Sequence, residues 1–216
     1  MKIIRTRNYR AAADAAYGTI AGHGIAAMPT DTAYGLSGLL EDSVIRRIFK
    51  IKGRPKDKPI PVIADSFEMV SRMAVLDKSV TDSLAKLWPG PLSVILQKKE
   101  GVSELLTAGT GKIMVRIPDD DFILMVLRKL AKPITSTSAN VSGNPPIFNG
   151  DMLEKEFAGA EDTPDLVLNC GTLRLGAVST IIDLSLGGMP ELVRGGAYPN
   201  DKIESAFGVH FSGVLL

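Results

Sequence analysis

Apolar and polar positions along the chain follow two different periods. Apolar residues three and four apart, which place one face of a helix against a core, recur in seven stretches. Short apolar runs bounded by Gly, Pro or polar residues lie between them and predict strands. The predicted helices span 8–22, 43–51, 66–74, 78–88, 121–131, 151–158 and 201–207, and the predicted strands span 25–28, 60–64, 92–96, 112–118, 166–168, 179–184 and 192–194.

Alternating helices and strands predict an α/β fold with a twisted sheet flanked by helices. Two pairs of strands, 92–96 with 112–118 and 179–184 with 192–194, follow one another without a long helix between them. The sheet is therefore expected to be mixed rather than purely parallel. The 216 residues contain no low-complexity linker, so we predict a single domain over 1–216.

The composition is that of an ordinary globular protein, 45% hydrophobic and 23% charged. A net charge of +1 excludes a nucleic-acid binder driven by whole-chain charge. No apolar run approaches the ~20 residues of a membrane span, and no apolar segment follows the basic N-terminus. Cys170 is the single cysteine, so no intramolecular disulfide can form. These features predict a cytoplasmic protein without a membrane segment.

Five cations occupy every second position after the second predicted helix. In an extended chain, side chains two residues apart face the same way. Gly and Pro between and after the cations predict a stiffened loop that faces something anionic. The alternative is a solvated lysine loop. This cation row consists of Lys50, Lys52, Arg54, Lys56 and Lys58.

Hydroxyl side chains gather in two runs along the chain. The strand at 25–28 runs into Pro29-Thr30-Asp31-Thr32, and Ile134 begins the run ITSTSANVSG. Ligands bind at the carboxyl ends of strands in open α/β sheets, although turns and helix caps also use these residue types. Arg116 lies within an apolar run, where an arginine is costly unless it is paired or faces a wet pocket.

Several site motifs are absent from the sequence, namely a Walker A motif, G-x-G-x-x-G, G-x-S-x-G and a zinc-ligand set. The candidate site residues that remain are cations and hydroxyl-bearing side chains. Such a site suits a polyphosphate, because displacement at phosphorus needs positioning and charge neutralisation more than an acid or a base.

Seven motifs in order resemble the YrdC/Sua5 family of threonylcarbamoyl-AMP synthases. Each motif alone is weak, but together they cover about residues 10–200. The motifs are Thr30-Asp31-Thr32 with Tyr34-Gly35, Lys52-x-Arg54-Pro55, Trp88-Pro89-Gly90-Pro91-Leu92, Val115-Arg116-Ile117-Pro118, Ser138-Ala139-Asn140 with Ser142-Gly143, Ser179-Thr180-Ile181 and Leu192-Val193-Arg194.

The resemblance implies a YrdC/RibB-like domain with a concave basic cleft. It implies a nucleotidyltransferase that converts L-threonine, bicarbonate and ATP, with Mg²⁺, into threonylcarbamoyl-AMP and pyrophosphate. The product serves the t6A modification of adenosine 37 in tRNA through a threonylcarbamoyl transferase. The chain resembles the short, single-domain form of the family.

The resemblance also implies roles for individual residues. Lys52 and Arg54 would be catalytic and hold the ATP phosphates. Relatives often carry an acidic residue where this chain has Val178. This chain therefore has no carboxylate at that position to take any role that the acidic residue has. The threonine-binding residues would be Thr30, Thr32, Arg116, Thr137 and Ser179, and the ATP-binding residues Lys52, Arg54, Lys56, Ser138, Asn140 and Arg194, with no metal ligand from the protein.

Two other functions compete with the synthase. One is a double-stranded RNA-binding module of the same fold without synthase activity, for which a basic cleft would suffice. The other is the carbamoyl-adenylating domain of hydrogenase-maturation proteins, which works beside acylphosphatase and zinc-finger segments that this sequence lacks. Residues 143–150, with Gly at both ends and two prolines, are a candidate lid.

Overall fold

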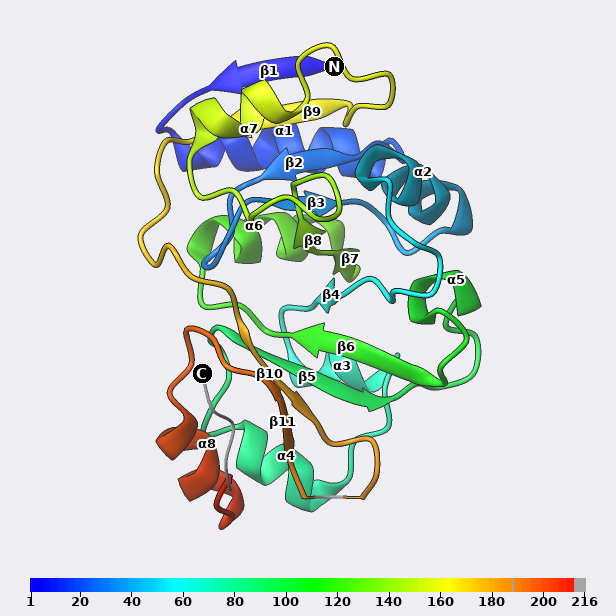
Figure 1. Cartoon of the computed structure of the whole chain (residues 1–216), viewed down its shortest axis with the longest axis vertical. Helices are drawn as coiled ribbons and strands as arrows, with labels where there is room; N and C mark the ends of the chain where they lie inside the picture. The colour runs from blue at the N-terminus through cyan, green and yellow to red at the C-terminus, as the bar shows by residue number, and fades with distance from the viewer. Residues whose placement is uncertain (188, 212–216) are drawn as a thin grey trace.

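The computed structural model describes residues 1–187 and 189–211. Its strands form two separate mixed sheets, one above the other along the long axis of the molecule (Figure 1). The mixed α/β class is confirmed, whereas the division into two sheets was not predicted. The first sheet has the order β1 (Lys2–Arg5), β9 (Leu166–Asn169), β2 (Ala26–Met28), β3 (Gly35–Ser37) and β8 (Thr137–Ser138). The second has the order β11 (Glu191–Arg194), β10 (Thr180–Asp183), β5 (Leu92–Gln97), β6 (Lys112–Arg116), β4 (Val62–Ile63) and β7 (Ile134–Thr135).

The hydroxyl run that begins at Ile134 passes from one sheet to the other. Its first two residues form β7 and pair antiparallel with β4, and Thr137 and Ser138 form β8 and pair antiparallel with β3. Ser136 lies between the two strands. The run therefore joins the facing edges of both sheets, which places its side chains between them.

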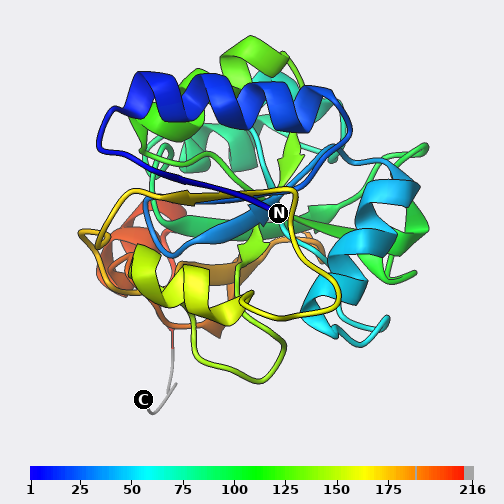
Figure 2. The same ribbon diagram turned by 90° about the horizontal axis from the view of Figure 1, so that it is seen from above.

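Helices cover both faces of the first sheet. Seen from above, its strands lie between α1 (Tyr9–Ala21) and α7 (Gly150–Glu156) (Figure 2). Small and branched residues of α1 pack against α6 (Asp121–Leu130) in one apolar cluster. Asn8 and Asp120 cap these two helices by accepting backbone N–H groups.

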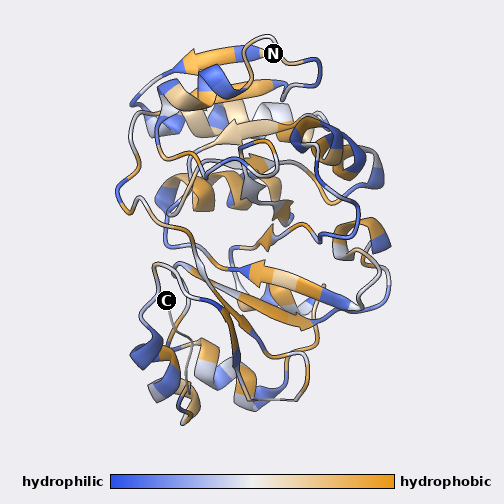
Figure 3. Cartoon of the chain, viewed as in Figure 1, coloured by the Kyte–Doolittle hydropathy of each residue, from blue (hydrophilic) through white to orange (hydrophobic). Residues whose placement is uncertain are grey.

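The second sheet packs against the remaining core. Its central strands are mostly hydrophobic, whereas α2 (Asp42–Lys52) shows both hydrophobic and hydrophilic residues (Figure 3). The other helices are α3 (Phe67–Ser71), α4 (Lys78–Leu84), α5 (Glu104–Thr107) and α8 (Asn200–Phe207). Within residues 1–187 and 189–211, none of the helices combines the length and apolar character needed to cross a membrane.

The cation row differs from its predicted extended form. Lys50 and Lys52 belong to the last turn of α2, which ends at Gly53 with a φ of 54°. A left-handed residue is a favourable helix end, and glycine adopts it without steric cost. Because the row is partly helical, its members point in different directions: Lys52 is buried, whereas Lys56 and Lys58 are exposed.

Besides β7 and β8, which the hydroxyl run forms, three short elements were not predicted. β1 pairs in parallel with β9, which lies more than 160 residues later in the chain. β3 contains Gly and Ser and pairs with β2 and β8. α5 has only four residues. Long-range pairing rather than local propensity forms the two strands, which is why the sequence pattern does not show them.

Candidate active site

A cavity of about 330 Å³ lies between the two sheets. Its walls come from segments that are far apart in the sequence: the turn after β2, the loop before β4, strands β5 and β6, the β7–β8 crossing and strand β11. Four cations line it, and none of its described lining residues is acidic. These cations are Arg54, Lys58, Arg116 and Arg194.

The turn after β2 supplies two buried hydroxyls. Thr30 Oγ1 donates to the carbonyl oxygen of Ala33 at 2.6 Å and accepts from the backbone N–H of Thr32 at 3.1 Å. The two threonine hydroxyl oxygens are 3.1 Å apart. Since the Thr30 proton is committed to Ala33, the Thr32 hydroxyl is the donor between the two threonines, and its oxygen remains able to accept a hydrogen bond from a ligand.

Arg116 lies on β6 and forms an ion pair with Asp31, in which both side chains are buried. The resemblance implies that Arg116 binds threonine; in the structure its guanidinium lines the cavity and is already paired with Asp31. Asp31 Oδ2 is buried without a hydrogen-bond partner among the described residues. Burial and the nearby Asp31 raise the pKa of Asp120, and its hydrogen bond from Ile123 N opposes that shift.

Ser179 and Arg194 form a second polar group on the other side of the cavity. Arg194 Nη2 donates to the Ser179 carbonyl oxygen at 2.6 Å, and the Ser179 hydroxyl lies 2.9 Å from that of Ser93. Burial lowers the pKa of Arg194. Val178 also lines the cavity and contributes an apolar surface there.

Lys52 does not line the cavity. Its Nζ donates to the carbonyl oxygens of Ser138 and Asn140, the latter at 2.6 Å, and Ser142 N donates to the Lys52 carbonyl at 2.7 Å. Burial is the main cause that lowers the pKa of Lys52 to about 7, and the neighbouring charge of Arg54 adds to it. The lysine thus binds the segment that follows β8 to the end of α2.

Arg54 is anchored at the cavity by its own loop. Nε donates to the Lys58 carbonyl at 3.2 Å and Nη2 to the Pro59 carbonyl at 2.8 Å. Lys56, in contrast, points to a different hollow. The Asn140 amide nitrogen donates to the carbonyls of Val141 and Asn144, and its Oδ1 is buried without a partner among the described residues.

The structure thus brings together most of the predicted site residues. Eight of them line the cavity: Thr30, Thr32, Arg54, Arg116, Thr137, Ser138, Ser179 and Arg194. Lys52, Lys56 and Asn140 do not. Three further lining residues, Lys58, Ser93 and Ser136, were not predicted. Lys58 belongs to the cation row and Ser136 to the hydroxyl run, so both motifs indicated them. Ser93 is a single polar residue in an apolar strand and gave no such signal.

The protein offers no dedicated metal site in the part of the chain that the structure describes. No group of three or more His, Cys, Asp or Glu side chains converges there.

The chain is similar to known proteins over most of its length. Residues 19–196 match the Sua5/YciO/YrdC family model, described as "Telomere recombination". The threonylcarbamoyl-AMP synthase of Pyrococcus abyssi is 35% identical over 186 residues, 85% of this chain and 54% of that protein. The protein of the same name from Bacillus subtilis is 29% identical over 187 residues, 85% of this chain and 53% of that protein.

Similarity in structure agrees with similarity in sequence. The crystal structure of P. abyssi Sua5 complexed with L-threonine matches with a TM-score of 0.87 and 33% identity, over 97% of this chain and 61% of that chain. The chain spans about half the length of the two named relatives. The matched residues and the shared fold establish that the chain belongs to the Sua5/YciO/YrdC family.

Proposed function

We propose that this chain synthesises L-threonylcarbamoyladenylate and pyrophosphate from L-threonine, bicarbonate and ATP, as a nucleotidyltransferase. The observation that carries the proposal is the cavity between the sheets, where hydroxyl and cationic side chains from separate segments converge. Two relatives named threonylcarbamoyl-AMP synthase and a related structure that binds L-threonine support it.

The cavity has two electrostatically different ends. Asp31 neutralises Arg116, so this end suits the amino acid, with hydroxyls from Thr32, Thr137 and Ser179 nearby. Arg54 and Lys58 have no such carboxylate partner among the described residues and suit the polyphosphate, with Ser138 and Arg194 along the same cavity. An uncompensated cation stabilises an anion more strongly than a paired one.

The reaction requires charge neutralisation more than proton transfer. The amine of threonine captures bicarbonate as a carbamate with loss of water. A carbamate oxygen then attacks the α-phosphorus, and the bond from this phosphorus to the bridging oxygen breaks as pyrophosphate leaves with its electron pair. Arg54 and Lys58 stabilise the charge on that leaving group. The carbamate is already anionic, so no general base is needed for the attack.

Lys52 takes a different part from the one its motif suggests. We propose that it supports the segment carrying Ser138 and Asn140 rather than contacting phosphate, since its Nζ is used by two carbonyls. Mg²⁺ would arrive with ATP as part of that substrate. The product would pass to a threonylcarbamoyl transferase in the cytoplasm for modification of adenosine 37 in tRNA.

The test is pyrophosphate release by purified protein with Mg²⁺, ATP and bicarbonate, with and without L-threonine. Release that requires both threonine and bicarbonate, and is absent with serine, is the expected outcome. Arg54→Gln should lower the rate about 10²-fold or more, because a preorganised charge is lost. Arg128→Gln, an exposed arginine on α6, should leave it unchanged.

Release without dependence on threonine would overturn the substrate assignment. A folded protein that releases no pyrophosphate but binds double-stranded RNA with steep salt dependence would replace the synthase by the RNA-binding module.

A further inference from the structure

A second hollow of about 280 Å³ lies outside the active-site cavity, between the end of α2 and α5. Its exposed walls are almost entirely carbon. Phe49 of α2 and Leu105 of α5 are its apolar lining side chains, and Gly53 lines it without a side chain. A Cβ added at Gly53 would meet no atom within 4 Å, which shows how open the hollow is there.

One face of α2 builds the hollow. Arg46, Phe49, Lys50 and Gly53 are spaced i, i+3, i+4 and i+7, which places them on a single stripe of the helix. The aromatic ring is nearly buried, at 8% exposed, while the two cations beside it are exposed. The stripe thus combines an apolar centre with a charged border.

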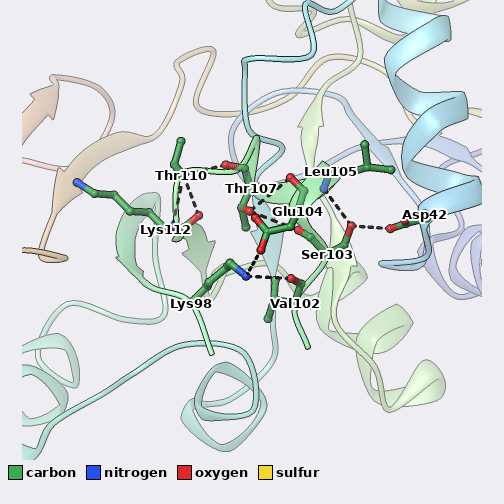
Figure 4. Close-up of polar contacts among 9 residues, drawn as sticks. All are labelled: Asp42, Lys98, Val102, Ser103, Glu104, Leu105, Thr107, Thr110 and Lys112. Carbon is green, nitrogen blue, oxygen red and sulfur yellow. Dashed lines mark hydrogen bonds and ion pairs between the residues drawn. The ribbon is translucent and has the colours of Figure 1, made fainter. Parts of the chain in front are cut away.

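The opposite wall is fixed by hydrogen bonds. Ser103 Oγ donates to Asp42 Oδ1 on α2 at 2.5 Å, and Lys98 Nζ donates to Glu104 Oε1 at 2.7 Å (Figure 4). Ile60 N also donates to the carbonyl of Leu106 at 2.9 Å. The Ser103–Asp42 bond joins the N-cap of α5 to α2, while the other two bonds fix α5 to Lys98, after β5, and to Ile60, before β4. Because α5 is fixed in this way, the hollow exists before any ligand arrives.

The border of the hollow carries unneutralised positive charge. Arg46, Lys50, Arg54 and Lys56 surround it, and within residues 1–187 and 189–211 none of them forms an ion pair with a carboxylate. The neighbouring Arg47, on another face of α2, is paired with Asp165 at 2.9 Å. Burial lowers the pKa of Arg54. The negative charge of the nearby Asp57 opposes this shift, but it is the smaller of the two effects.

We propose that this hollow is a docking site for an acidic, amphipathic segment of a partner protein. An apolar side chain of that segment fills the hollow, and its carboxylates meet Arg46, Lys50 and Lys56 at the border. Helical segments bind apolar grooves in this way, with anchors at i, i+3, i+4 and i+7. A nucleic acid fits less well, because carbon walls offer a base edge no hydrogen-bonding group and phosphates alone need no apolar hollow.

The site adjoins the catalytic cavity through one residue. Arg54 lines both the hollow and the cavity. A partner bound here is therefore one side chain away from the proposed polyphosphate end. The docking site itself does not depend on the proposed reaction, and the test below measures binding alone.

The test is fluorescence polarisation with a labelled probe peptide. The probe is a Glu-rich helical peptide of about 14 residues, four turns, with Leu at i, i+3 and i+7. We expect the wild-type protein to bind it and Arg46→Glu/Lys50→Glu to bind it at least about tenfold more weakly, because rim charges guide and hold an oppositely charged partner. Lys86→Glu/Lys202→Glu makes the same charge change at two exposed residues of another surface and should bind like wild type.

Three controls make the outcome decisive. A probe with Ala in place of each Leu should bind at least about tenfold more weakly, since it lacks the apolar side chain that fills the hollow. Threonine-dependent pyrophosphate release and thermal melting should be unchanged in Arg46→Glu/Lys50→Glu, which shows that the variant is folded. Wild-type protein that fails to bind the probe, equal binding of the Ala probe, or equal weakening by Lys86→Glu/Lys202→Glu would overturn the proposal. Loss of affinity for an RNA oligonucleotide in Arg46→Glu/Lys50→Glu without loss for the probe would assign the surface to nucleic acid instead.

Discussion

Two buried cations near the cavity are stabilised in different ways. Arg116 has a carboxylate partner, Asp31, whereas Lys52 has only carbonyl oxygens. A buried charge costs several kcal/mol unless it is paired and hydrogen-bonded. The two residues therefore respond differently to pH and to substitution.

Lys52 should make the stability of the protein depend on pH. Its pKa falls from 10.5 in the unfolded chain to about 7 in the folded protein. Between these values the unfolded chain binds more protons, so the free energy of unfolding rises with pH, and below pH 7 the contribution is constant. We expect urea unfolding to show that the free energy of unfolding of the wild type, relative to that of Lys52→Met, rises by on the order of a few kcal/mol between pH 7 and pH 10.

The exposed Lys50 provides the control for this measurement. Lys50→Met should follow the wild-type pH dependence, because the side chain is solvated in both states. If wild type and Lys52→Met keep a constant difference across the interval, Lys52 is charged in the folded protein throughout. In that case its carbonyl bonds outweigh burial.

Removing Asp31 should be strongly destabilising. Asp31→Asn leaves the guanidinium of Arg116 buried without a counter-charge, which we expect to lower the free energy of unfolding by about 3–5 kcal/mol. Asp31→Asn/Arg116→Met removes both charges and should recover part of that loss. Urea titration gives each value. Asp82→Asn, which breaks an exposed pair with Lys78, should change little, and an equal effect would contradict the argument.

At the scale of elements, strand ends and short connections position the polar side chains. β10 and β11 pair antiparallel, and the chain after β11 returns against the segment that precedes β10. Ser179 and Arg194 meet there. Close backbone approach, rather than side-chain packing, fixes this part of the cavity.

Gly196 should be essential to that approach. A Cβ at this position would lie 2.5 Å from the Val178 carbonyl oxygen and 2.5 Å from the Ser179 carbonyl carbon, so Gly196→Ala must displace Ser179. Threonine-dependent pyrophosphate release should lose about tenfold or more in kcat/KM, since small misplacements of a binding group are costly. Gly195→Ala, whose Cβ meets no atom within 4 Å, should behave like wild type. Equal activity of the two variants would exclude this role.

At the scale of the whole molecule, three chain crossings join the two sheets across the cavity. The chain passes from the first sheet to the second between β3 and β4, returns between β7 and β8, and passes back between β9 and β10. Tyr34 anchors the last crossing, because its hydroxyl donates to the Gly171 carbonyl at 2.8 Å and accepts from Cys170 N at 3.0 Å. Burial is the main cause that raises the pKa of Tyr34.

Tyr34→Phe should therefore loosen the crossing between β9 and β10. The two backbone groups lose their partner, which costs about 1–3 kcal/mol for buried polar groups. Hydrogen exchange should show faster exchange of the Cys170 amide, whereas strand amides of β5 keep their protection. Tyr17→Phe, at a half-exposed tyrosine on α1, is the matched control and should leave the Cys170 amide unchanged.

The sequence by itself determined the α/β class, most helices and strands, and the residue types of the site. Amphipathic spacing and turn residues are local signals, and the helices α1, α2 and α6 are found close to where the pattern predicted them. Hydroxyl and cationic motifs also indicated polyphosphate chemistry, because the chemistry of these side chains does not depend on their position in the fold.

Only the tertiary structure decided how the strands are divided between two sheets and which motif residues face the cavity. The split into two sheets depends on pairings such as β1 with β9, which no local signal specifies. Lys52 turns inward because it falls in the last turn of a helix, whereas Arg54, past the Gly53 cap, faces the cavity. A partner such as Asp31 for Arg116 lies 85 residues away in the chain, and only folding brings such charges together.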